Sequence, residues 1–364
     1  MQENRIALLV VGFACAACLS APVVAQLAPE NTSVQGEHRA IAPGRVAELP
    51  TLRVEVDSTH GEIRLIAGPL DLPAMPEMSG HQGEDVSFQI AWPADGWIQG
   101  WRGDVLDDEG RPLPHRLIHH IGLVDLERRA LLYGEFERLL AVGGETEPVA
   151  LPRYIGASAH TGERFLLFLR LHNGGARDIH HARAILTLRW APRGTVHPTE
   201  VFPFYADVHN TVGGTTQFDL PLGRSTVRYE FVQPVTGGLV VAGGHMHDYA
   251  REVRLEDAES GKVLVRLEAK RDAAGHVQGV GRFIFGFHEE ALRLEAGHCY
   301  RIVAEYDNTS GHPIADGGMA SLSGPFVPDD AHQWPRPDMR DRELQRDMTS
   351  LGLSVTADAG EPPR

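Results

Sequence analysis

The sequence predicts an all-β protein made of two tandem, jelly-roll-like antiparallel β-sandwich domains. The chain has 364 residues, of which 42% are hydrophobic and 23% charged, so it is long enough for two globular domains. Short alternating or apolar runs recur along it and are broken by Gly, Pro, Asn and Asp, as in strands joined by turns. Beyond the N-terminal segment, the chain lacks the long 3.6-residue periodicity that a helical domain needs.

The expected strands are short runs separated by turn signals, a pattern typical of sandwiches and jelly rolls. A hairpin connection is expected at residues 256–261, which are polar and end in glycine. The clearest strand runs are Leu52–Val56, Ser87–Trp92, Phe165–Leu171, Ala184–Trp190, Thr226–Phe231, Leu239–Ala242, Val263–Leu267, Arg282–Phe287 and Tyr300–Tyr306.

Composition divides the chain into domains. Proline and glycine around residues 191–195 mark a boundary between a first domain, 47–191, and a second, 195–328. From residue 329 to 364 the chain is rich in Asp, Arg, Gln and Pro, which predicts a polar tail. Within that tail Asp338–Leu351 is expected to form a helix, and the last dozen residues are expected to be disordered.

The N-terminus resembles a targeting segment. Arg5 precedes an apolar run at residues 6–19, and small residues follow, so residues 1–25 predict a signal peptide and a secreted or periplasmic protein. A lipoprotein modified at Cys18 is the alternative, although the residue three places before it is not aliphatic. No other run approaches the ~20 apolar residues of a membrane helix, so stable membrane insertion is not expected. Cleavage would leave Cys299, which is expected to be a buried thiol in a strand.

The net charge of −15 argues against nucleic acid and anionic membrane surfaces as partners. It is compatible with a soluble protein that attracts cations. The chain also carries 19 histidines, so the clustering of histidines is more informative than their presence.

The sharpest histidine cluster is His245-Met246-His247, which follows Gly243-Gly244 and an apolar strand. In an extended chain, side chains two residues apart point to the same face. His245 and His247 can therefore reach one metal ion while Met246 faces away. The alternative is a chance pair in a histidine-rich chain.

Two further candidates are weaker when each is taken alone. Neighbouring residues on a strand point to opposite faces, so His119 and His120 can share a metal only if the backbone bulges or the strand ends there. A second pair, His180-His181, lies in a polar turn, where a solvated face is the simpler account. His172 ends an apolar strand, where a capping or core role is the simpler account for a lone histidine.

Met319 lies in a glycine-rich turn, Asp316-Gly317-Gly318-Met319. A thioether is a soft ligand that selects Cu(I) over zinc or magnesium. One methionine in such a turn is suggestive only in combination with the histidines.

Taken in order along the chain, these residues resemble the copper type II, ascorbate-dependent monooxygenases, which include the peptidylglycine α-hydroxylating and dopamine β-monooxygenases. The shared order is His-His, a lone His after an apolar strand, His-x-His and then Met. The resemblance covers residues 50–328. The matching residues are His119, His120, His172, His245, His247 and Met319, with support from Pro152–Arg164, Leu169–Asn173 and Glu305–Asn308.

The resemblance implies a fold of two jelly-roll domains and two copper ions per chain. It assigns one copper, which relays electrons from ascorbate or a similar reductant, to His119, His120 and His172. It assigns the second copper, which reacts with O2 and a substrate C–H bond, to His245, His247 and Met319, the residues expected to be catalytic.

The sequence departs from the peptide-amidating branch at two positions. That branch has an arginine where this chain has Gly243, and a tyrosine where it has Ser323. The expected function is therefore copper-dependent hydroxylation of a small molecule other than a peptide amide precursor. A non-catalytic secreted or periplasmic copper-binding protein on the same fold is the alternative, and a β-sandwich binding module with incidental histidines is a third.

Overall fold

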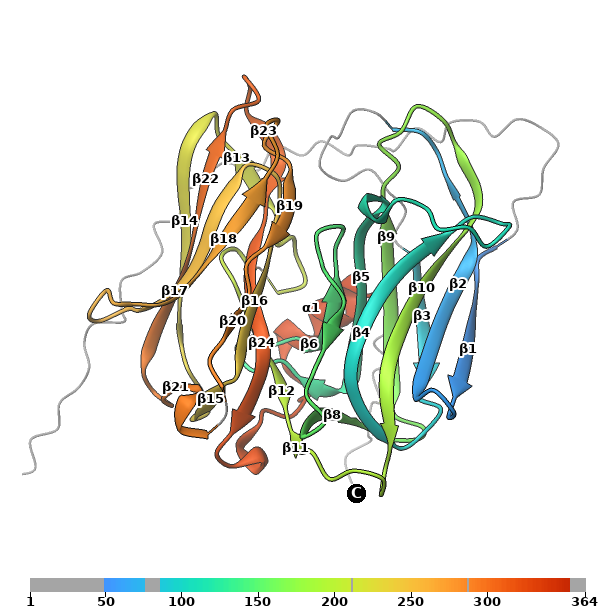
Figure 1. The fold of residues 1–364 in the computed structure, drawn as a ribbon. Coiled ribbons are helices and arrows are strands. Elements are labelled where there is room, and N and C mark those ends of the chain that lie inside the picture. Colours follow the sequence, from blue (N-terminus) through green and yellow to red (C-terminus); the bar gives the residue numbers. More distant parts are fainter. Residues whose placement is uncertain (1–48, 76–85, 211, 287, 354–364) are drawn as a thin grey trace, which may run out of the picture. The chain divides into compact units, whose positions relative to one another are not determined.

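The computed structural model describes residues 49–75, 86–210, 212–286 and 288–353, which belong to one compact unit (Figure 1). The expected signal peptide and the last eleven residues lie outside the described residues. The described chain is almost entirely β-strand with one α-helix, so the predicted all-β, sandwich-like fold class is confirmed. Within this part of the chain, no helix is long and apolar enough to cross a membrane.

The first half of the chain forms two antiparallel sheets with one short parallel edge strand. The larger sheet has the order β1-β2-β10-β4-β8-β11, with β7 paired to β4, and the smaller has the order β3-β9-β5-β6. The larger sheet comprises β1 (Thr51–Asp57), β2 (Glu62–Leu72), β4 (Gly96–Leu106), β7 (Val149–Ala150), β8 (Ile155–Ala159), β10 (Ile179–Pro192) and β11 (Thr199–Glu200). The smaller comprises β3 (Val86–Ala91), β5 (Ile118–Arg129), β6 (Phe136–Val142) and β9 (Arg164–Leu171).

The second half also has two main sheets and a two-stranded ribbon. One sheet comprises β12 (Phe202–Asp207), β15 (Gly237–Leu239), β16 (Val241–Met246), β20 (Phe283–Ile284), β21 (Leu292–Leu294) and β24 (Ala320–Pro328). The other comprises β14 (Gly223–Val232), β17 (Ala250–Asp257), β18 (Val263–Arg271), β19 (Val277–Val280) and β22 (Cys299–Asn308). The ribbon pairs β13 (Phe218–Leu220) with β23 (Ile314–Gly318), and short 3-10 turns occur at His115–Leu117, His288–Glu290 and Ala331–Gln333.

Each half has a core between its two sheets. In the first, Leu65 of β2 and Leu123 of β5 belong to one fully buried cluster. In the second, Leu322 of β24 and Ile302 of β22 belong to one fully buried cluster. The alternation of buried and exposed residues along the strands is what a sandwich requires, because successive side chains point to opposite faces of a sheet. Cys299 is buried at the start of β22, as expected for a structural thiol.

One expected strand is interrupted. The run Leu239–Ala242 is divided between β15 and β16, and both pair with β24. Leu239 is opposite Phe326 and Gly243 is opposite Ser323, so four steps on one strand face three on the other. This is a β-bulge, which bends a strand and re-aims the residues that follow it. The His-x-His segment lies directly after this bulge.

Two elements that follow the expected domain boundary, β11 and α1 (Arg342–Ser350), pack against the first half. β11, beyond the expected boundary near residue 194, pairs in parallel with β8 of the first half. At the other end, α1 lies within the range expected for a helix, and Leu344 and Met348 pack into a cluster with β5, β6 and β9. The Asp347 carboxylate accepts a 2.9 Å hydrogen bond from the backbone N–H of Phe136. The polar tail is therefore, up to residue 353, part of the packed fold.

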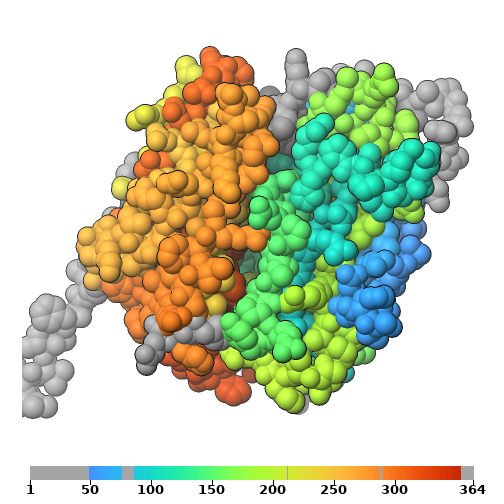
Figure 2. Space-filling view, viewed as in Figure 1, coloured from blue at the N-terminus to red at the C-terminus, as the bar shows by residue number. Residues whose placement is uncertain are grey.

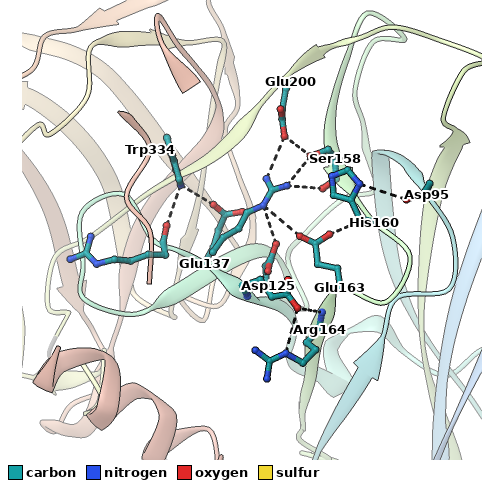
Figure 3. A network of polar contacts seen from close by, with 12 residues as sticks. Asp95, Asp125, Glu137, Ser158, His160, Glu163, Arg164, Glu200 and Trp334 are labelled. Carbon is teal, nitrogen blue, oxygen red and sulfur yellow. Dashed lines mark hydrogen bonds and ion pairs between the residues drawn. The ribbon is translucent and has the colours of Figure 1, made fainter. Parts of the chain in front are cut away.

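A network of polar contacts joins acidic side chains of the first half to Glu200 and Trp334 (Figure 3). Trp334 donates from Nε1 to the Glu137 carboxylate at 3.1 Å, and burial raises the pKa of Glu137 to about 8 despite the attraction of Arg128. Burial also raises the pKa of Asp125 to about 7. The Arg128 guanidinium pairs with Asp125 at 3.3 Å, Glu163 at 3.7 Å and Glu200 at 3.5 Å.

Candidate metal centre

His119 and His120 open strand β5, and the backbone bulges at this point. Ile118 pairs with Leu171 of β9 while His120 pairs with Arg170, so two steps along β5 face one step along β9. The extra residue, His119, breaks the alternation that would send the two side chains to opposite faces. The two imidazole rings accordingly lie with centroids 4.2 Å apart. The bulge that the two histidines need in order to share a metal ion is therefore present.

His245 and His247 lie at the end of β16. Met246 between them is 2% exposed and belongs to the core, so the two histidines point to the other face. Their ring centroids are 5.2 Å apart. His247 is held just beyond the strand because its backbone N–H donates to the Met319 carbonyl at 3.0 Å.

The two histidine pairs meet each other. The ring of His119 lies 5.4 Å from that of His247, and the ring of His120 lies 5.0 Å from that of His245. One ligand nitrogen from each of His119, His120 and His247 lies within 4.8 Å of the other two, which is close enough for a single metal ion. The four histidines are called the histidine cluster below. Two come from each half of the chain.

This grouping differs from the one that the sequence suggested. His172 follows β9, with its backbone N–H bonded to the Leu117 carbonyl, and it influences the pKa of His119. Among the described residues, the three-ligand group takes its third member from His247 rather than from His172. The reason is topological, because the bulged start of β5 and the end of β16 face each other across the two halves.

Met319 lies beside the histidine cluster, anchored by its backbone. Its carbonyl accepts from the Tyr306 hydroxyl at 2.5 Å as well as from His247, and its sulfur accepts from the Thr216 hydroxyl at 3.6 Å. Met319 also lines the cavity that His120 and His245 line. The structure thus places Met319 next to His247 and at the wall of the cavity.

Three of the four imidazoles are held in the neutral form. Burial lowers the pKa of His119 to about 4, and the neighbouring His245 adds to the effect. Burial and the other histidines also lower the pKa of His120 and of His247 well below the usual range. Neutral imidazoles at neutral pH offer lone pairs, which is the form that binds a metal ion.

His245 differs because it has an acidic partner. Its Nδ1 lies 2.5 Å from Oε1 of Glu145, and although burial opposes it, the charge of Glu145 raises the pKa of His245. The sequence offered no signal for this contact, since Glu145 lies 100 residues away in the loop after β6. Among the described residues, the Nε2 atoms of His245 and His247 are buried with no hydrogen-bond partner. Buried polar atoms without a partner are rare, and a bound ligand would satisfy them.

A cavity of about 990 Å³ lies beside the cluster and is lined by both halves. Figure 2 shows the furrow between the green and orange parts of the chain, which belong to the two halves. Apolar residues such as Phe168 and polar ones such as Tyr205 and Ser321 form its walls. Gly243 leaves the cavity open at its position. A Cβ built there would have its nearest neighbour, the Ser323 carbonyl oxygen, 3.8 Å away. The volume is large enough for a small organic molecule.

Comparisons with known proteins leave the chain without an assigned family. No family model matches it, and no curated protein matches it. Among solved structures, a peptide:N-glycanase F is similar over 70% of this chain and 95% of its own, with 9% identity and a TM-score of 0.34. The major capsid protein of mavirus is similar over 85% of this chain and 94% of its own, with 10% identity and a TM-score of 0.17. Likenesses at these scores carry no argument about function.

Proposed function

We propose that this protein is a copper-dependent oxidoreductase of the monooxygenase type, which hydroxylates a small molecule with O2 and an ascorbate-type reductant. The observation that carries the proposal is the convergence of His119, His120 and His247, with His245 beside them. These residues come from two segments more than 120 positions apart, so chance clustering in a histidine-rich chain is a poor explanation.

The donor set fits copper. Imidazole nitrogens suit copper, zinc, iron and nickel, and the nearby thioether of Met319 favours Cu(I) among these. The buried Nε2 atoms of His245 and His247 offer two donors that no described residue satisfies. Bound copper would supply the one-electron and oxygen chemistry that side chains cannot perform.

The protein's own groups prepare the site for that role. Burial keeps the imidazoles of His119, His120 and His247 neutral, so that their lone pairs are available at neutral pH. The adjoining cavity of about 990 Å³ provides a place for a substrate beside His120, His245 and Met319. A merely storage-type site has no need of such a cavity, and this favours catalysis over the non-catalytic alternative.

The geometry favours a copper centre shared by the halves, whereas the family resemblance implies two separate ions. Removing one ligand from each half separates these arrangements. If the centre is shared, His120→Ala and His247→Ala should each lose the same copper ion. If the ions are separate, each variant should keep the copper of the intact half.

The chain contains a matched control. His180 belongs to a second His-His pair, is exposed, and lies outside the histidine cluster. His180→Ala should therefore retain the copper content of the unchanged protein. Its neighbour His181 is less suitable, because its φ of 55° would strain an alanine.

Metal content and oxygen consumption together test the proposal. Purified protein loaded with copper should consume oxygen when ascorbate is added with a substrate, and Met319→Ala should reduce this consumption. Binding of zinc in preference to copper would refute the copper assignment. Tight copper binding without any oxygen reduction would identify the non-catalytic alternative.

A further inference from the structure

Glu145 makes a contact that the proposed function does not explain. Its Oε1 lies 2.5 Å from Nδ1 of His245, and the two side chains are only 10% and 20% exposed. A carboxylate accepts hydrogen bonds and does not donate them, so the proton of this contact must reside on Nδ1. When His245 is neutral, its lone pair is then on Nε2, the buried atom that lacks a hydrogen-bond partner among the described residues.

The loop that carries Glu145 is held in place. The backbone N–H of Gly143 donates to the Thr146 hydroxyl at 2.9 Å, and the Thr146 N–H returns a bond to the Gly143 carbonyl at 3.0 Å. The His115 Nδ1 lies 2.9 Å from the Gly144 carbonyl, which ties the loop to the start of β5. Glu145 is therefore presented by a closed turn, fixed next to the strand that bears His119 and His120.

The same loop makes a second contact with the other half. The Arg282 guanidinium donates to the Glu147 carbonyl at 2.8 Å. Two contacts from one five-residue segment thus join the first half to β16 and to the segment before β20. The segment holds the His245 side chain against the half of the protein that supplies His119 and His120.

We propose that Glu145 is a positioning residue for the metal centre. It fixes the tautomer of His245 in which Nε2 faces the metal, and it joins the His-x-His segment to the half that carries His119 and His120. This inference rests on the proposed function. Metal-binding histidines commonly donate their second N–H to a carboxylate, and loss of such a partner typically lowers metal affinity about 10- to 100-fold.

Three variants test the inference. Glu145→Ala removes the acceptor and should lower copper affinity about 10- to 100-fold. It should also change the nitrogen hyperfine pattern in the EPR spectrum of the Cu(II) form. Glu145→Gln keeps a carbonyl oxygen that can accept from Nδ1–H, so it should restore most of the affinity. Glu147→Ala is the matched control, because the contact of Glu147 with Arg282 uses its backbone carbonyl.

A measurement without metal separates this inference from the proposed function. The ¹⁵N shifts of His245 in the metal-free protein at about pH 9 should show the Nδ1–H tautomer in the unchanged protein and a mixture in Glu145→Ala. If this change occurs but no variant binds copper, the positioning role stands and the copper proposal fails. Unchanged shifts and unchanged copper affinity in Glu145→Ala would overturn the inference, as would a Glu145→Gln variant that behaves like Glu145→Ala.

Discussion

Replacing Glu137 by glutamine should change how the stability of the protein depends on pH. The Glu137 side chain is completely buried, and its Oε1 has no hydrogen-bond partner among the described residues. Burial raises its pKa to about 8 from an ordinary value of 4.5. The folded protein therefore keeps a proton on Glu137 over a pH range in which the unfolded chain has released it.

The sign and size of the effect follow from this difference. The contribution of Glu137 to stability is greatest below pH 4.5 and is lost as pH rises towards about 8. Each unit of this range changes the free energy of unfolding by about 1.4 kcal/mol for one proton. Between pH 5.5 and 7.5 the unfolding free energy should therefore fall by about 2.5 kcal/mol relative to Glu137→Gln.

Urea unfolding of both proteins at pH 5.5, 6.5 and 7.5 measures this difference. The buried histidines titrate with the opposite sign, but they are common to both proteins and cancel in the comparison. A buried amide N–H of the glutamine that is left unpaired costs about 1–3 kcal/mol, and this offset is the same at every pH. Glu109→Gln, whose side chain is 64% exposed, is the control and should follow the unchanged protein. Stability curves for Glu137→Gln that run parallel to those of the unchanged protein would refute the reasoning.

The packing of the fold gives further predictions, all measured by urea unfolding at one pH. Leu344→Ala should lower the unfolding free energy by about 2–5 kcal/mol, because this fully buried side chain fixes α1 to the first half; a loss below about 1 kcal/mol would mean that α1 is not part of the core. Gly122→Ala should cost about 1–3 kcal/mol, because the new Cβ would lie 2.1 Å from the Phe168 ring. Gly243→Ala, with its nearest neighbour at 3.8 Å, should leave stability nearly unchanged. Copper at about 100 times its dissociation constant should add about 2.7 kcal/mol, and no gain would contradict binding to the folded state.

The strands could be predicted because their signal is local. Alternation along a run such as Phe165–Leu171 reports burial on one or both faces of a sheet, and β9 occupies residues 164–171. Turn residues between the runs report where the chain reverses. The His-x-His geometry is equally local, because a spacing of two residues in an extended chain sends both side chains to the same side at the end of β16.

The bulge at His119 lies at the limit of such reasoning. From the sequence, His119 and His120 can bind one metal only if the strand bulges or ends there. Whether it bulges depends on how the strand is paired with its neighbour. Only the pairing of β5 with β9 shows that the extra residue is there. The same applies to the β-bulge between Leu239 and Gly243, which depends on the pairing with β24.

The sequence by itself determined the fold class and the residues with metal-binding chemistry, because both are written in side-chain type and short-range spacing. The tertiary structure decided which of those residues meet. It placed His247 beside His119 and His120, brought Glu145 to His245, and returned α1 to the first half. Contacts between residues a hundred positions apart depend on how the sheets pack, and no local pattern along the chain records that packing.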